Sequence, residues 1–252
     1  MDQFLKTYWK TLLFFGAAGL FGGFCTGLFV LESYPAEIQQ QILAQGLNGF
    51  LLGVITAVQA ACYGVVLGGA GIFLGKKVGV LKDEKSFTKK HLVIAIVVAV
   101  IGGLMMILPD LLFFGRYSEV IMDSYAVKPS VFYILGGVIY GGVIEEVMLR
   151  LFMMSLIAFL LHMILERKRE TASAAVLISA NVITAVLFAA GHLPATFLMI
   201  GSSPLIIFRC FLLNGGFGLL FGWLYRKYGL RYAMIAHGGC HVVSKLIWIL
   251  FL

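Results

Sequence analysis

Apolar stretches long enough to cross a lipid bilayer recur along the whole chain. A transmembrane helix needs about 20 apolar residues. Seven stretches reach that length, at residues 11–31, 48–75, 92–115, 131–164, 173–200, 205–225 and 232–252. No small-residue cleavage site follows the first, so we expect a retained span rather than a signal peptide. The pattern predicts an all-α, polytopic transmembrane helical bundle of about seven spans, forming a single domain over residues 1–252.

Two segments depart from a simple row of spans. The stretch 131–164 is long for one crossing, so we expect it to tilt, to protrude or to contain a break. Residues 35–46 are polar enough for an external loop or a short interfacial helix.

Basic residues between the spans indicate the orientation of the chain. Only Arg116 and Lys128 lie on one side, together with acidic residues that include Asp110. Fourteen lie on the other side: Lys6, Lys10, Lys76, Lys77, Lys82, Lys85, Lys89, Lys90, Arg167, Lys168, Arg169, Arg226, Lys227 and Arg231. Because positive loops stay in the cytoplasm, the N-terminus is predicted to be cytoplasmic and the C-terminus external.

Composition supports a membrane protein and excludes several other classes. Hydrophobic residues make up 61% of the 252 residues and charged residues only 12%, whereas soluble domains carry about 25% charged residues. The four cysteines are far apart and form no C-x-x-C pair, so they are interpreted as apolar packing residues. The net charge of +7 reflects topology, and no nucleic-acid-binding or nucleotide-binding motif accompanies it.

A few ionisable residues lie inside the predicted spans, where each costs at least ~2.5 kcal/mol and is a functional candidate. We expect Lys245 to extend its amine to the outer interface. Arg209 is expected to reach that interface or to pair within the bundle. The complete set is Glu145, Glu146, Arg150, His192, Arg209, His237, His241 and Lys245.

The segment GGVIEEVMLRLF, residues 141–152, carries two adjacent carboxylates. Glu146 and Arg150 are four residues apart and can pair on one helix face. Glu145 is then left to face another helix, and a carboxylate in a partly enclosed site suits a general base. The alternative is that all three residues form a network that locks the helices together. For the Glu146–Arg150 pair, structural and catalytic roles can coexist.

Three histidines complete the intramembrane set. His192 follows Phe188 by four residues and precedes Pro194, which removes a donor and is expected to perturb the helix. A single histidine of this kind is equally well explained by packing. His237 and His241 share a helix face, and they could bind a metal or donate two hydrogen bonds to one anion.

The signatures of several other intramembrane proteases do not occur in the sequence. There is no H-E-x-x-H for a zinc protease, no G-x-S-x-G for a serine protease, and no pair of intramembrane aspartates.

The three motifs in this order resemble those of the CPBP family of CAAX prenyl endopeptidases and bacteriocin-processing proteins, also called Abi. The resemblance covers residues 131–245, and the context 216–237 before the last motif contributes to it. It implies a glutamate-dependent intramembrane peptidase that requires no cofactor. By position, Glu145 matches the catalytic glutamate, His192 its partner in activating water, and His237 the oxyanion histidine.

The remaining motif positions are implied in the same way. Glu146 and Arg150 match residues that orient the site. His241 stands where the family usually has Asn or Asp, so its role departs from the family pattern. The minority alternative is a zinc ion held by Glu145, His192, His237 and His241.

Helix lengths allow these residues to meet at one depth. Glu145 lies about 21 Å from the outer end of its span, and His237 lies about 8 Å from the inner end of its own. Both are then in the cytoplasmic half of a ~30 Å core. His192 reaches the same depth only if its helix begins as a cytoplasmic extension, which we expect.

The residues favour a peptidase that cleaves a membrane-associated peptide or protein, within lipid and without nucleic acid. The short chain and the altered fourth position favour a bacterial cell membrane. The alternative is a non-proteolytic immunity or regulatory protein of the same fold, which binds a peptide or a membrane partner. A proton-coupled or metal transporter is a third interpretation, but the sequence shows no inverted repeat.

Overall fold

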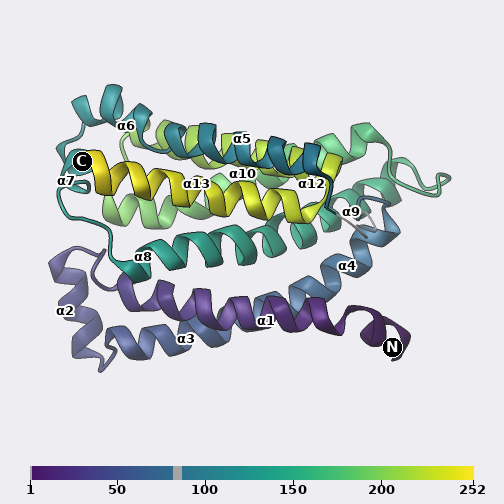
Figure 1. Ribbon diagram of the computed structural model, residues 1–252, viewed down its shortest axis with the longest axis horizontal. Helices are drawn as coiled ribbons and strands as arrows, with labels where there is room; N and C mark the ends of the chain where they lie inside the picture. The colour runs from purple at the N-terminus through teal and green to yellow at the C-terminus, as the bar shows by residue number, and fades with distance from the viewer. Residues whose placement is uncertain (1, 82–86) are drawn as a thin grey trace.

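The computed structural model describes residues 2–81 and 87–252, and within them the chain is all-helical (Figure 1). Seven helices in these ranges are long and apolar enough to cross a membrane: Gln3–Val30, Gly49–Lys77, Lys89–Arg116, Val131–Leu165, Ala174–Met199, Pro204–Tyr228 and Leu230–Phe251. The seven predicted spans and the all-α fold are therefore confirmed. Of the basic residues used to predict orientation, Lys82 and Lys85 lie outside the described residues.

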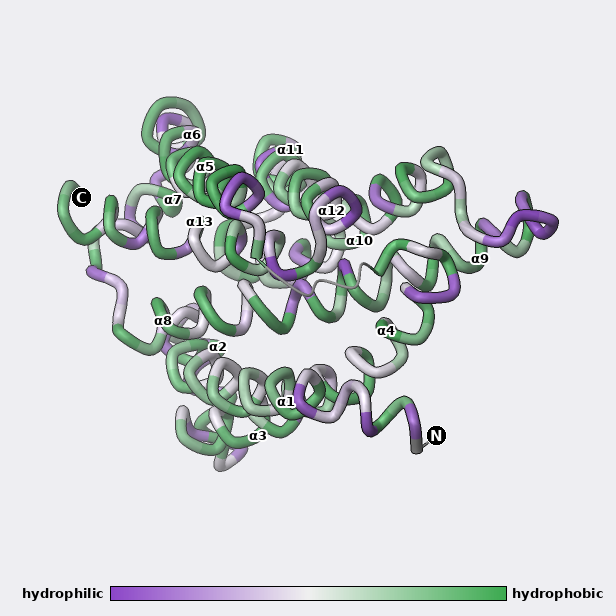
Figure 2. The backbone as a smooth tube through the Cα atoms, turned by 45° about the vertical axis from the view of Figure 1, so that its right-hand side comes forward, coloured by the Kyte–Doolittle hydropathy of each residue, from purple (hydrophilic) through white to green (hydrophobic). Residues whose placement is uncertain are grey.

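Hydrophobic residues line the long helices, and hydrophilic residues gather at the turns that join them (Figure 2). The first half of the chain contains α1 (Asp2–Val30), α2 (Ala36–Ala44), α3 (Gly49–Cys62), a π-helical turn η1 (Tyr63–Leu67), α4 (Gly68–Lys77), α5 (Lys89–Met105), α6 (Leu108–Leu112), a short 3-10 turn η2 (Phe114–Arg116) and α7 (Glu119–Asp123). The polar segment 35–46 is therefore a short helix, α2.

The second half contains the helices that carry the predicted motifs. These are α8 (Val131–Leu135), the π-helical segments η3 (Gly136–Glu145) and η4 (Val147–Met154), α9 (Ser155–Leu165), α10 (Ala174–Met199), α11 (Pro204–Cys210), π-helical η5 (Phe211–Gly215), α12 (Gly216–Tyr228) and α13 (Leu230–Phe251). The long fourth stretch runs from α8 to α9 as one helix of 35 residues without a break. It is wound partly as π-helix, a form often found at functional sites.

Serine and asparagine side chains fix several helix starts. Asn48 accepts a hydrogen bond from the Leu51 N–H, and Ser173 accepts one from Val176. Each satisfies a backbone donor that the first turn of a helix leaves unpaired. Ser173 therefore sets the start of α10, and the predicted fifth span begins at the same residue.

Small residues determine how closely the helices approach. Gly19, Gly23 and Gly27 form a stripe along α1, and a Cβ atom at Gly23 would meet the Thr56 carbonyl oxygen of α3 at 2.5 Å. Such stripes allow helix backbones to approach closely in lipid. The α1–α3 pair forms one side of the molecule, and η3 joins it to the second layer by contacting both α1 and α13.

The largest buried cluster lies where η4, α10, α12 and α13 meet. Leu151, Phe221, Leu224 and Ala233 are fully buried there. Among the helices that carry the motifs, α10 packs against η4 and against α12, and α12 packs against α13. The motif helices therefore surround this core. The core therefore holds the motif residues at fixed positions.

Two expectations about the outer residues are wrong. Asp110, taken from the sequence as an outer-loop residue, is buried in α6 with 1% of its surface exposed. Lys245, expected to extend to the interface, is buried at 6% and its Nζ donates to the Tyr133 hydroxyl at 3.3 Å. In both cases a partner from a distant part of the chain replaces water.

Candidate active site

Four of the predicted residues line one small cavity inside the helix bundle. Glu145 comes from η3, His192 from α10, and His237 and His241 from α13. The cavity has a volume of about 100 Å³, which is room for about three water molecules at ~30 Å³ each. The fold thus brings three separate motifs to one point that can hold water.

His192 lies deep enough in the bundle to meet His237 at the cavity. His192 lies 18 residues into α10, which begins at Ala174. The turn between α9 and α10 extends beyond the α12–α13 turn along the long axis of the molecule (Figure 1). The early start of α10 brings His192 level with His237. Pro194 does not break α10, which continues to Met199.

A chain of buried charges supports one side of the cavity. Arg150 Nη1 lies 3.0 Å from Glu146 Oε1, and the same carboxylate oxygen lies 2.8 Å from His237 Nδ1. Arg150 and Glu146 are 1% and 0% exposed, so the predicted i,i+4 pair exists and is fully buried. Arg150 Nη2 also donates to the Gly218 carbonyl oxygen at 3.2 Å. This chain fixes η4 against α12 and α13.

Glu145 has different surroundings from its neighbour. Its side chain is 22% exposed, and its Oε2 lies 3.8 Å from His237 Nε2. Glu145 lines the cavity, whereas Glu146 is not among the lining residues. Of the two adjacent carboxylates, Glu145 is therefore the one that can contact a water molecule in the cavity.

Hydrogen bonding fixes the tautomer of His192. Its Nδ1 lies 2.9 Å from the Phe188 carbonyl oxygen. A carbonyl oxygen can only accept, so Nδ1 carries the proton and donates. In a neutral ring, Nε2 is then left with a lone pair. His192 can therefore accept a proton from water through that nitrogen.

The two α13 histidines stack on each other and against neighbouring groups. Their ring centroids lie 5.3 Å apart, and Phe221 also stacks on His237, with ring centroids 4.5 Å apart. The His241 ring lies against Gly137 and Gly141, whose added Cβ atoms would come within 3.0 Å and 2.9 Å of its nitrogens. These glycines make room for the imidazole ring of His241.

Several lining residues were not singled out in the sequence. Asn214 of η5 is a polar side chain within an apolar span, a signal that could have identified it. Phe221 carries no such signal, because it is one of 21 phenylalanines in the chain. The remaining unpredicted lining residues are Met106, Phe217 and Cys240, whereas Phe188 belongs to the predicted motif that ends at His192.

The zinc alternative requires the cavity side chains to converge as metal ligands. Within residues 2–81 and 87–252, no group of three or more His, Cys, Asp or Glu side chains is arranged to hold a metal ion. His237 Nδ1 is already engaged with Glu146. The alternative of a zinc ion stays a prediction, to be tested by chelation.

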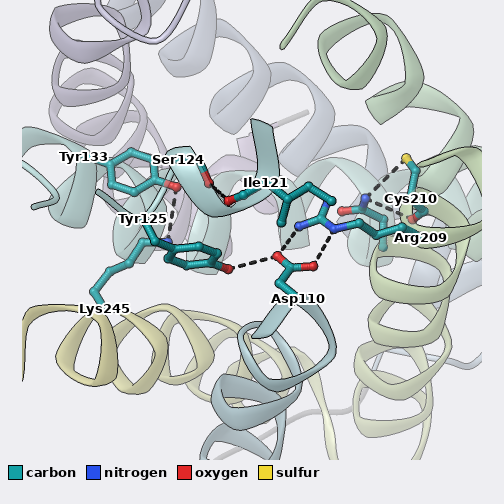
Figure 3. Close-up of polar contacts among 9 residues, drawn as sticks. Asp110, Ile121, Ser124, Tyr125, Tyr133, Arg209, Cys210 and Lys245 are labelled. Carbon is teal, nitrogen blue, oxygen red and sulfur yellow. Dashed lines mark hydrogen bonds and ion pairs between the residues drawn. The ribbon is translucent and has the colours of Figure 1, made fainter. Parts of the chain in front are cut away.

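A second polar network joins α6, α11 and the segment after α7 (Figure 3). Arg209 of α11 donates from Nε to Asp110 Oδ1 at 2.6 Å and from Nη2 to Oδ2 at 2.5 Å. The Tyr125 hydroxyl donates to Oδ2 at 2.9 Å. Burial, followed by the charge of Asp110, raises the pKa of Tyr125 well above its ordinary value, so the phenol keeps its proton. Of the two expectations for Arg209, pairing within the bundle is confirmed.

This network joins segments that border the cavity. Asp110 lies four residues beyond Met106, and Arg209 lies five residues before Asn214. Both Met106 and Asn214 line the cavity. The ion pair therefore fixes α6 to α11 close to the site.

The geometry agrees with the comparison of the chain with protein families. Residues 127–243 match the family model of the type II CAAX prenyl endopeptidase Rce1-like proteins. This segment belongs to the Rce1-like family. The resemblance predicted from residues 131–245 is thereby confirmed. Searches of curated proteins and of solved structures found no match.

The matched segment contains the residues of the candidate active site. CAAX prenyl endopeptidases are peptidases. The Rce1-like segment contains Glu145 and the three histidines that line the cavity, together with Glu146 and Arg150. The first three spans lie outside the matched segment.

Proposed function

We propose that the protein is a glutamate-dependent intramembrane endopeptidase. It hydrolyses a peptide bond of a membrane-associated peptide or protein with water activated by Glu145 and His192. One observation carries the proposal: Glu145, His192, His237 and His241, from three helices, line a single cavity large enough for water. Membership of a peptidase family supports it.

Glu145 and His192 activate water as two hydrogen-bond acceptors in the cavity. The Glu145 carboxylate accepts a hydrogen bond from a water molecule, and the free Nε2 of neutral His192 accepts a second one. As the water oxygen attacks the peptide carbonyl, one of its protons moves to this pair. That proton then passes to the leaving nitrogen when the tetrahedral intermediate collapses.

His237 is placed to stabilise the developing oxyanion. Its Nδ1 faces the Glu146 carboxylate, an acceptor, so Nδ1 carries a proton. When the His237 ring is an imidazolium, Nε2 also carries a proton. Nε2 can then donate a hydrogen bond to the oxyanion from the cavity side. Removal of one such donor costs about 10²–10³ in rate. His241 supplies a second nitrogen beside it.

The substrate class follows from the family and the location of the site. A cavity between membrane helices is reached most directly by substrates already in the bilayer. The family name specifies CAAX prenyl endopeptidases, but we propose a bacterial cell membrane as the location, where prenylated substrates are not expected. The substrate we propose is therefore a membrane-associated peptide or protein.

Substrate trapping with an inactive variant tests the proposal. Glu145→Gln and His192→Ala should each abolish cleavage while the protein stays folded and inserted. Mass spectrometry of membrane peptides from cells expressing wild type or Glu145→Gln should show peptides that persist uncut only with the variant. Glu119→Gln, an exposed carboxylate in α7, is the matched control and should behave as wild type.

Identical peptide sets for wild type and Glu145→Gln would contradict the peptidase. Binding of an uncut peptide by both proteins would then favour the non-proteolytic alternative.

A further inference from the structure

A second and larger cavity lies at the predicted cytoplasmic end of the bundle. Its volume is about 690 Å³, within the range of about 300–1,000 Å³ that is usual for ligand sites. It lies between the first half of α1, the end of α4 and the start of α13, with η4 contributing Leu151. It shares no lining residue with the candidate active site.

The cavity has an apolar interior and a basic rim. Phe14, Phe15, Ile72, Leu151 and Met234 form apolar walls. Three exposed cations also line it: Lys10 from α1, Lys76 from α4 and Arg231 from α13. Among the described residues that line this cavity there is no Asp or Glu. Within the described part of the chain, the lining therefore combines apolar walls with three cations at the opening.

Aromatic side chains place this opening at headgroup level. Trp9 is 52% exposed, next to Lys10, and exposed tryptophans next to basic residues mark the boundary between hydrocarbon and water. The Lys76 amine lies 4.8 Å from the ring centre of Tyr8, which also lines the cavity. Lys76 is thus held beside the opening.

We propose that this cavity binds one anionic phospholipid, with its phosphate among Lys10, Lys76 and Arg231 and one acyl chain against the apolar walls. A soluble anion would gain nothing from the apolar interior, and an uncharged lipid would gain nothing from three cations. Anionic headgroups gain about 1 kcal/mol per basic residue near the membrane surface. The proposal does not depend on peptidase activity, because it is read out as binding.

Native mass spectrometry of the full-length protein in non-ionic detergent tests the site. Phosphatidylglycerol should bind with one tight equivalent, and phosphatidylcholine of the same chains should bind far more weakly. The triple variant Lys10→Gln, Lys76→Gln, Arg231→Gln should lose about a hundredfold in affinity, at about 1 kcal/mol per cation. The control variant Lys77→Gln, Lys89→Gln, Lys90→Gln removes the same charge from outside the cavity and should bind as wild type.

A second pair of variants tests the acyl chain. Thr11→Trp fills the cavity from an exposed position on α1 and should weaken binding about tenfold, the loss expected when two methylenes no longer fit. Leu13→Trp, on the lipid-facing side of α1 at 62% exposure, is its control.

Three outcomes would overturn the proposal. The first is equal binding of the two lipids, and the second is equal loss in both charge variants. The third is inorganic phosphate that binds as tightly as phosphatidylglycerol, because it would indicate a site for phosphate alone. Unchanged binding by Thr11→Trp would refute the acyl-chain pocket.

Discussion

Two adjacent glutamates take different surroundings because a helix directs neighbouring side chains to different faces. Glu146 is fully buried between Arg150 and His237, while Glu145 is partly exposed and borders the cavity. A buried carboxylate is tolerated only when it is paired. Glu146 is thus suited to positioning His237, and Glu145 to contacting water.

We expect Glu146→Gln to destabilise the protein and Glu145→Gln to leave its stability nearly unchanged. Loss of the Glu146 charge leaves the Arg150 guanidinium, 1% exposed, without its anion. Breaking one side of a buried pair costs about 3–5 kcal/mol. Thermal unfolding in detergent measures the difference, and equal midpoints for the two variants would show that Glu146 is not a structural partner.

His241 is predicted to act as a hydrogen-bond donor. His241→Asn should then keep most activity, because an amide N–H replaces the ring N–H. His241→Ala should lose about 10²–10³ in rate. Initial rates on a substrate identified by trapping provide the measurement.

Chelation separates this role from a metal role. If His241 is only a donor, a zinc chelator should leave activity unchanged. Loss of activity with the chelator and with His241→Asn, together with stoichiometric zinc in the purified protein, would instead favour the zinc alternative.

At the scale of helices, spacing along the sequence predicted contacts within one helix but not contacts between helices. The Glu146–Arg150 pair could be predicted because both residues lie on one helix, four positions apart. The burial of Asp110 and Lys245 could not, because their partners Arg209 and Tyr133 come from other spans. A sequence shows which residues are costly in lipid, but not which helices lie beside them.

The approach of η3 to α13 positions Glu145 against His237, and glycine makes it possible. A Cβ atom at Gly142 would lie 2.8 Å from the Cα of Gly238. We expect Gly142→Ala to push the two helices apart and to reduce the cleavage rate more than tenfold, because ~1 Å of displacement can cost about 10²-fold. Gly216→Ala is the control, since a Cβ there meets nothing within 4 Å. Equal rates for the two variants would contradict this account.

At the scale of the molecule, the number of spans follows from hydrophobic length alone. The convergence of the motifs was harder to predict, since the depth of His192 depended on where α10 begins. The resemblance supplied the roles that periodicity could not. The second cavity had no sequence signal, because its lining comes from four separate helical elements and from Leu81 after α4.

The predicted orientation can be measured directly. Seven spans place the two termini on opposite sides, and the basic loops predict a cytoplasmic N-terminus. In a chain without its native cysteines, Lys10→Cys should react with a membrane-impermeant thiol reagent only after the cell membrane is opened. Lys128→Cys, in the loop before α8, should react in intact cells. The reverse pattern would invert the topology.

The size of the candidate active site has a consequence for turnover. About 100 Å³ admits a few water molecules but no stretch of polypeptide. Before a bond can be cut, neighbouring helices have to separate and let the substrate backbone in. For the proposed peptidase, the composition and tension of the surrounding bilayer should therefore govern the rate of turnover, even where the chemical step itself is fast.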